Sequence, residues 1–197
     1  MTTPTQPLSF AVLLGSVRTE RMGDRAATLV VHALQARGHE AQLVDPLALQ
    51  LPLLDRMYKE YPAGRAPAAL EQLATLYRRV DGFVIVSAEY NHSVPPALSN
   101  LLDHFLEEYF WRPSGIVCYS AGQFGGVRAA VQLRAMLAEL GMPAIPSECA
   151  IPRIGTALNA QGLAQNEHVT HTLERFLDEL CWYARALRRE RAIGTPR

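Results

Sequence analysis

Four short runs of apolar, β-prone residues recur at a nearly constant interval, at residues 10–14, 41–44, 83–87 and 116–120. Almost every side chain in these runs is apolar, whereas a half-buried strand alternates apolar with polar residues. Continuous apolar runs are typical of parallel strands that are covered on both faces by crossover helices. The chain is therefore expected to alternate strands with helices.

Apolar residues recur at helical spacing after each of these runs. The helical faces lie within residues 26–34, 70–77, 98–105 and 130–140, and Gly141 is the expected stop of the last helix. A final strand is expected near residues 144–148, where Pro143 and Pro146 restrict it to an irregular position at the sheet edge. This order predicts a doubly wound α/β sandwich, in which ligands bind at the carboxyl ends of strands where the chain order reverses.

A long closing helix is expected over residues 169–187, where apolar residues again recur at helical spacing. Four arginines lie near its end. We expect them to form a solvated face that complements the helix dipole; they are Arg185, Arg188, Arg189 and Arg191.

The composition fits one globular domain over residues 1–197, with 49% hydrophobic and 19% charged residues. A chain of this length buries about 70% of its unfolded surface, so its core needs neither disulfides nor a structural metal. Nineteen basic residues balance nineteen acidic ones, which makes nucleic acid an unexpected partner. Lys59 is the only lysine, which disfavours Schiff-base chemistry and a phosphate-loop lysine.

The cysteines and the first residues indicate a cytoplasmic protein. Cys118, Cys149 and Cys181 are widely spaced and form no CxxC pair, so neither a disulfide framework nor a metal site is expected. Residues 1–7 contain no basic cluster followed by an apolar stretch, and no run approaches the ~18 apolar residues of a membrane span. We therefore expect a soluble protein with no membrane partner.

The first strand run leads into Gly15-Ser16-Val17-Arg18-Thr19-Glu20-Arg21-Met22-Gly23. A turn here exposes backbone N–H groups at the positive end of a helix dipole and adds two hydroxyls and two guanidinium groups. This combination predicts a site for an anion, most simply a phosphate monoester, although an ordinary strand-to-helix turn is the alternative. The chain has neither a GxxxxGK[ST] phosphate loop nor a GxGxxG fingerprint, which disfavours permanent nicotinamide binding by that route.

The third and fourth strand runs lead into residues 87–96 and 120–126, which a doubly wound sheet places beside the first loop. Tyr90 and Phe124 can pack on an aromatic ring, Asn91 and Ser93 can bind its edge, and the glycines allow close backbone approach. Together the three loops predict a site for a phosphate tail and a flat polar ring. Taken singly, the features of each loop also fit a plain structural role, such as an aromatic side chain of the core or a tight turn of the backbone.

These segments resemble the NAD(P)H-dependent FMN reductases of the flavodoxin-like superfamily. The matching segments are GS-x-R at residues 15–18, EYN-x-S-x-P at residues 89–95, SAGQFGGVR at residues 120–128, and Gly141-Met142-Pro143. The resemblance implies a flavodoxin-like sandwich with a five-stranded parallel sheet in the order 2-1-3-4-5. It also implies non-covalently bound FMN, with NADPH or NADH as a transient co-substrate.

The resemblance implies a set of cofactor-binding residues. Those expected at the phosphate are Ser16, Arg18, Arg21, Met22 and Gly23. Those expected to line the isoalloxazine, largely through backbone, are Glu89, Tyr90, Asn91, His92 and Ser93, and those expected over its pyrimidine side are Ser120, Ala121, Gly122, Gln123, Phe124 and Gly125. The family usually has proline and glycine where this chain has Ala88 and His92, and often Ser or Asn where it has Arg21 and Gly23.

In such an enzyme the flavin carries the chemistry, so no catalytic side chain is predicted. NAD(P)H and an acceptor (a quinone, free flavin, an azo compound or a metal oxyanion) would use one open pocket in turn, which is ping-pong kinetics. His92 is a possible modulator, near enough to the flavin edge to stabilise the reduced ring or to donate a proton; a surface histidine at a loop tip is the alternative. Relatives pack the region of Tyr109, Phe110 and Trp111 against a second subunit, so a homodimer or homotetramer is expected.

Two other functions remain as alternatives. A small serine hydrolase would use Ser120, since residues 118–122 resemble a GxSxG elbow, with Asp178 and His168 or His171 as partners. Both histidines precede the aspartate, which is the wrong order for that fold, and Cys118 replaces the first glycine of the elbow. A flavodoxin-type electron carrier would bind FMN without turnover, but such carriers are usually strongly acidic and this chain is neutral.

Overall fold

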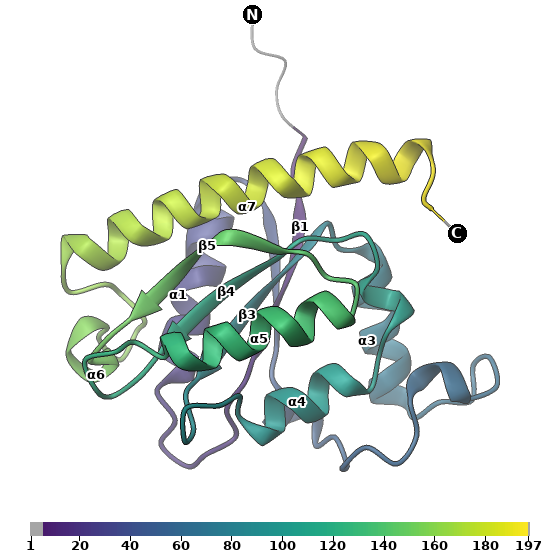
Figure 1. The fold of residues 1–197 in the computed structure, drawn as a ribbon, viewed down its shortest axis with the longest axis horizontal. Helices are drawn as coiled ribbons and strands as arrows, with labels where there is room; N and C mark the ends of the chain where they lie inside the picture. The colour runs from purple at the N-terminus through teal and green to yellow at the C-terminus, as the bar shows by residue number, and fades with distance from the viewer. Residues whose placement is uncertain (1–5, 197) are drawn as a thin grey trace, which may run out of the picture.

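The computed structural model describes residues 6–196, so residues 1–5 and 197 of the expected domain lie outside the described part. Five strands form one parallel sheet in the order β2-β1-β3-β4-β5 (Figure 1). The strands are β1 (Ser9–Leu14), β2 (Glu40–Val44), β3 (Gly82–Ala88), β4 (Ser114–Tyr119) and β5 (Ala144–Ile151). The predicted flavodoxin-like order is confirmed, and each apolar run forms the expected strand. The central strands β1, β3 and β4 are almost wholly buried, as continuous apolar runs require.

Helices cover both faces of the sheet. On one face pack α1 (Gly23–Ala36) and α7 (Glu167–Ile193), and on the other α3 (Ala68–Arg79), α4 (Pro96–Asp103) and α5 (Val127–Glu139). Figure 1 shows α7 running along the length of the sheet. Four shorter helices were not predicted from the apolar spacing, namely α2 (Pro46–Leu49), α6 (Ile154–Ala157), η1 (Tyr58–Glu60) and η2 (Glu107–Tyr109). None of the helices described between residues 6 and 196 is both long and apolar enough to cross a bilayer.

The last strand is irregular and lies at the sheet edge, as its prolines predict. Ser114 of β4 pairs with Ala144, but Ile116 pairs with Glu148, so β5 bulges between these two pairs. Arg134 of α5 donates hydrogen bonds to the carbonyl oxygens of residues 145 and 146, at 2.8 and 2.9 Å. The side chain thus satisfies backbone acceptors that the bulge removes from the ladder.

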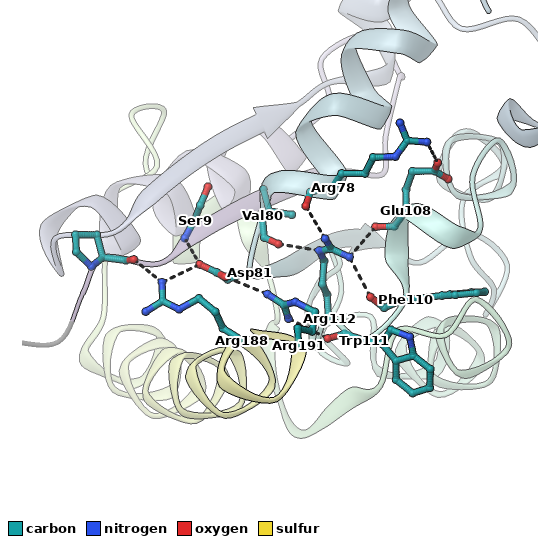
Figure 2. Close-up of polar contacts among 11 residues, drawn as sticks. Ser9, Arg78, Val80, Asp81, Glu108, Phe110, Trp111, Arg112, Arg188 and Arg191 are labelled. Carbon is teal, nitrogen blue, oxygen red and sulfur yellow. Dashed lines mark hydrogen bonds and ion pairs between the residues drawn. The ribbon is translucent and has the colours of Figure 1, made fainter. Parts of the chain in front are cut away.

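The prediction of a solvated arginine face at the end of α7 is wrong for two of the four arginines. Arg188 and Arg191 donate to the buried carboxylate of Asp81, at 3.3 and 3.1 Å, and Arg191 also donates to the Trp111 carbonyl oxygen at 2.9 Å (Figure 2). The backbone N–H of Ser9 binds the same carboxylate at 3.1 Å. Because Asp81 precedes β3 at the amino edge of the sheet, these contacts fix α7 across that edge.

The three aromatic residues after α4 do not form a shared exposed surface. Tyr109 is fully buried, and its ring centroid lies 5.4 Å from that of Tyr77 and 5.3 Å from that of Phe83. The turn η2 inserts this ring beneath α3, where edge contacts between rings are favourable. Phe110 packs against Gly141, and Trp111 alone is substantially exposed, at 41%.

Candidate functional site

A cleft of ≈ 330 Å³ opens at the carboxyl ends of β1, β3 and β4, which lie on the same edge of the parallel sheet. The chain passes from β1 to β2 on one side and returns to β3 on the other, so the cleft lies where the strand order reverses. Its volume is within the usual range for small-molecule sites, about 300–1,000 Å³. Its walls come from three loops and the start of α6: Ser16, Arg18, Thr19, Glu20, Arg21, Met22, Ala88, Glu89, Tyr90, Tyr119, Ser120, Ala121 and Ile154.

Ser16 joins the loop after β1 to the loop after β3. Its residue is 2% exposed, and its Oγ is hydrogen-bonded to Tyr90 Oη at 2.8 Å. The preceding Gly15 donates its N–H to the Val86 carbonyl oxygen at 2.8 Å, and a Cβ on this glycine would lie 3.0 Å from the same oxygen. Glycine therefore lets the first loop pass directly over β3 and present Ser16 to the cleft.

Arg21 is held by Asp45, the first residue after β2. Its Nη1 donates to Asp45 Oδ1 at 2.8 Å and to the Ser16 carbonyl oxygen at 2.7 Å, and its Nη2 donates to Asp45 Oδ2. Burial raises the pKa of Asp45, but the hydrogen bond and charge of Arg21, together with the backbone N–H groups of Leu47 and Ala48, leave the pKa below its usual value. Arg21 therefore fixes the shape of the first loop with its charge already balanced, whereas the exposed Arg18 lies over the Tyr90 ring, 5.8 Å from its centroid.

Tyr119, the last residue of β4, places its phenol against the start of α1. A Cβ on Gly23 would lie 2.2 Å from the Tyr119 hydroxyl oxygen. Tyr119 is 6% exposed, and burial raises the pKa of its phenol to about 12, although the nearby Ser16 hydroxyl opposes this rise. The phenol is therefore protonated at neutral pH and can donate a hydrogen bond into the cleft.

The loop after β3 is a tight hairpin turn. The backbones of Tyr90 and Ser93 exchange two hydrogen bonds at 3.0 and 2.9 Å, and the two residues between them have positive φ, 51° at Asn91 and 62° at His92. Positive φ at both central positions defines a type I′ turn. Gln132 of α5 accepts from Ser93 Oγ at 2.7 Å and donates to the His92 carbonyl oxygen at 2.8 Å, so this helix fixes the turn.

Glu89 has a structural task at this loop. Its Oε2 accepts the backbone N–H groups of Arg128 and Ala129, at 3.0 and 3.4 Å, in the first turn of α5. Its Oε1 lies 3.4 Å from the Arg128 guanidinium. The carboxylate thus caps a helix N-terminus, where a negative charge is favourable.

The loop after β4 is ordered by Ser120. Its Oγ donates to the Gly122 carbonyl oxygen and accepts from the Gly125 N–H, each at 3.0 Å. This hydroxyl is used within its own loop, and His168 and His171 are exposed on the first turns of α7. Asp178 pairs with Arg37 at 3.2 Å, and no hydrogen bond links these groups into a triad within residues 6–196. The geometry gives the hydrolase alternative no support.

The structure brings eight of the sequence-predicted site residues into the wall of the cleft: Ser16, Arg18, Arg21, Met22, Glu89, Tyr90, Ser120 and Ala121. The other predicted residues lie beside it. Asn91 and His92 form the exposed tip of the turn, Gly23 meets Tyr119, and Gln123 lines a separate hollow beside α6. Also outside the wall are Ser93, Gly122, Phe124 and Gly125.

Sequence reasoning missed Tyr119 and Asp45. Both stand at the carboxyl end of a strand, Tyr119 as the last residue of β4 and Asp45 directly after β2. The rule that ligands bind at these ends applies to both positions. Strand ends, as well as the loops that follow them, therefore carry the signal for both residues.

The chain is similar to known proteins over most of its length. The sequence model of the NADPH-dependent FMN reductase family matches residues 8–156. An NADPH azoreductase of Bacillus sp. is 31% identical over 122 residues, 61% of this chain and 66% of that protein. A quinone reductase of Escherichia coli is 31% identical over 137 residues, 68% of this chain and 71% of that protein.

Solved structures support the same fold. The flavoenzyme FerB, an NAD(P)H:(acceptor) oxidoreductase of Paracoccus denitrificans, matches with a TM-score of 0.75 at 21% identity, over 91% of this chain and 98% of FerB. That similarity shows a shared fold, and the family match covers all three loops of the cleft. The chain therefore belongs to the NADPH-dependent FMN reductase family and is an oxidoreductase whose cofactor is FMN and whose reductant is NAD(P)H.

Proposed function

We propose that the protein binds FMN non-covalently in the cleft between the loops after β1, β3 and β4 and passes electrons from NAD(P)H to a small-molecule acceptor. The observation that carries this proposal is the convergence of the three loops at the point where the strand order reverses. Quinones, azo compounds, free flavin and metal oxyanions are the proposed acceptor classes.

The residues of the cleft fit FMN by their chemistry. The Ser16 loop lies at the start of α1, where a phosphate is favoured, and offers a hydroxyl and the exposed Arg18. The Tyr90 ring and the backbone of Ser120 and Ala121 offer an aromatic surface and polar main-chain groups for a flat heterocycle. FMN, when bound, supplies the hydride chemistry, and these residues bind and orient it.

We further propose ping-pong kinetics. No dinucleotide fingerprint is present in the sequence, so NAD(P)H and the acceptor would occupy the same cleft in turn. His92 stands at the exposed tip of the turn, and we propose it as a modulator that holds a proton near the flavin edge. Equal quinone reductase activity in the wild type and in His92→Ala would exclude this role.

The visible spectrum of the purified protein tests the cofactor. Absorbance near ~450 nm and release of FMN on denaturation are expected; a colourless preparation is titrated with FMN. Steady-state rates with NADPH, NADH and a panel of acceptors then test turnover. Parallel double-reciprocal lines support ping-pong kinetics, converging lines contradict it, and FMN binding without NADPH oxidation supports the electron carrier instead.

We also propose that residues 1–197 act as one domain, in the cytoplasm, and assemble as a homodimer or homotetramer. Exposed leucines support the assembly: Leu53 is 84% exposed and Leu47 51%, on the segment from α2 to the loop that contacts α4. Exposed apolar side chains gathered in one region favour a partner surface. Light scattering measures the mass, and a monomer would contradict the assembly without affecting the cofactor proposal.

A further inference from the structure

A phenol occupies the space that a side chain at the start of α1 would fill. Gly23 is the first residue of α1, and a Cβ there would lie 2.2 Å from the Tyr119 hydroxyl oxygen and 2.9 Å from its Cζ. Any larger residue at position 23 therefore displaces this phenol. Tyr119 and Ser16 both line the cleft, so two hydroxyls gather where the loop after β1 enters the helix.

The guanidinium at this point that is not exposed is already paired. Arg21 binds Asp45, and the Asp24 carboxylate in the first turn of α1 accepts the backbone N–H of Arg25 at 2.9 Å and keeps its negative charge. Arg18 is exposed, where solvent screens its charge. A phosphate monoester bound here therefore depends on the helix dipole and on uncharged donors more than on paired guanidinium groups.

Tyr119 is built to act as such a donor. The residue belongs to the core that packs under α1, is 6% exposed, and also lines the cleft. Burial raises the pKa of this phenol to about 12, so it keeps its proton beside an anion at neutral pH. Ser16 Oγ is hydrogen-bonded to Tyr90 Oη at 2.8 Å and lies within hydrogen-bonding reach of the Tyr119 phenol. When Tyr90 donates to Ser16 and Ser16 donates to Tyr119, the Tyr119 proton is left for a ligand.

We propose that the Tyr119 hydroxyl donates a hydrogen bond to the 5′-phosphate of FMN and makes the site select FMN over riboflavin. This inference rests on the proposed function, because it assigns a residue to the cofactor phosphate. Gly23 is its necessary counterpart, since it leaves room for the phenol at the helix start.

The test compares FMN and riboflavin binding to flavin-free protein, followed by quenching of flavin fluorescence. Tyr119→Phe keeps the ring and removes one oxygen atom. The Kd for FMN is expected to rise about 10- to 100-fold, the usual effect of losing a hydrogen bond to a charged group. The Kd for riboflavin is expected to stay unchanged. Tyr183→Phe on α7 is the matched control and is expected to change neither constant.

A second variant tests the coupling between the two residues. Gly23→Ala forces the phenol away, so it is expected to lower the preference for FMN over riboflavin in the wild-type background. In the Tyr119→Phe background the same substitution is expected to cause no further loss of preference, because the hydroxyl is already absent. Thermal unfolding of each flavin-free variant shows that it is folded.

The outcomes separate this inference from the proposed function. A wild type that binds neither flavin contradicts the proposed function itself. A wild type that prefers FMN, with Tyr119→Phe weakening both flavins equally or neither, overturns the role of Tyr119 and leaves the cofactor proposal standing. Additive losses of preference in the double variant also overturn it, because they place the effect of Gly23 elsewhere.

Discussion

Replacing His92 by glycine is expected to stabilise the protein, although it removes a whole side chain. His92 has φ of 62°, and its backbone carbonyl oxygen accepts a hydrogen bond from Gln132, which a glycine at this position keeps. The left-handed conformation costs an L-residue about 1–2 kcal/mol, whereas glycine adopts it freely. Glycine in turn loses about 0.5–1 kcal/mol more backbone entropy on folding. The net gain is about 0.5–1 kcal/mol.

The assay is urea unfolding of the flavin-free protein, followed by circular dichroism. At this chain length, 1 kcal/mol corresponds to about 2–4 °C in Tm, so thermal unfolding provides a second measure. An unchanged m-value shows that unfolding exposes the same surface in both proteins, so that a shift of the urea midpoint reports a change in stability. Asn91→Gly is the matched control, because asparagine tolerates positive φ better than histidine and gains less from the same exchange. A His92→Gly variant less stable than the wild type, or less improved than Asn91→Gly, would refute the assignment of strain to this residue.

Other substitutions test other parts of the structure. The pKa of Asp45 is lower in the folded protein than in the unfolded chain, because Arg21 and backbone N–H groups bind its carboxylate. The stability that these contacts contribute is therefore present above the ordinary aspartate pKa of about 3.9 and is lost as the pH falls through the folded value. The stability difference between wild type and Asp45→Asn should shrink on acidification below about pH 4. Gly126→Ala forces a Cβ within 2.8 Å of a β4 carbonyl oxygen at φ of 83°, and urea unfolding should show a loss of more than about 1 kcal/mol. Asp81→Asn leaves two α7 arginines without their counter-charge, with an expected loss of about 1–3 kcal/mol in the same assay. Burial raises the pKa of Cys149 to about 12, so its thiol should react with a disulfide reagent at neutral pH only after unfolding.

The strands and long helices could be predicted because each is specified by its own residues. Local patterns specify them: the apolar runs of β1, β3 and β4, and the helical spacing of apolar residues in α1 and α5. Burial of these apolar residues is enough to explain why the elements pack together. The short helices could not be predicted this way, since a helix of four residues or fewer spans about one turn and shows no repeat of apolar residues. Pro96 at the first position of α4 was predictable, because proline is well suited to that place.

The roles of individual polar side chains were harder to predict from the sequence, because they depend on partners far away along the chain. Glu89 caps a helix that begins 38 residues later, and Asp81 holds arginines more than 100 residues away. The arginines of α7 show the same limit. Their spacing fits a solvated face, and only the path of the helix across the amino edge of the sheet brings two of them to a buried carboxylate.

The contacts around the cleft indicate that the proposed FMN site is largely formed by the protein alone. Ser16 ties the first loop to the second through Tyr90, Gln132 fixes the hairpin turn, and Ser120 orders the third loop through its own hydrogen bonds. Loops that are already ordered lose little further conformational entropy on binding, so more of the contact energy appears as affinity. Removing one of these hydrogen bonds should therefore weaken the binding of FMN and riboflavin alike, whereas removing a donor to the phosphate should weaken the binding of FMN alone. This contrast separates residues that arrange the cleft, such as Gln132, from a residue that recognises the phosphate, as proposed for Tyr119.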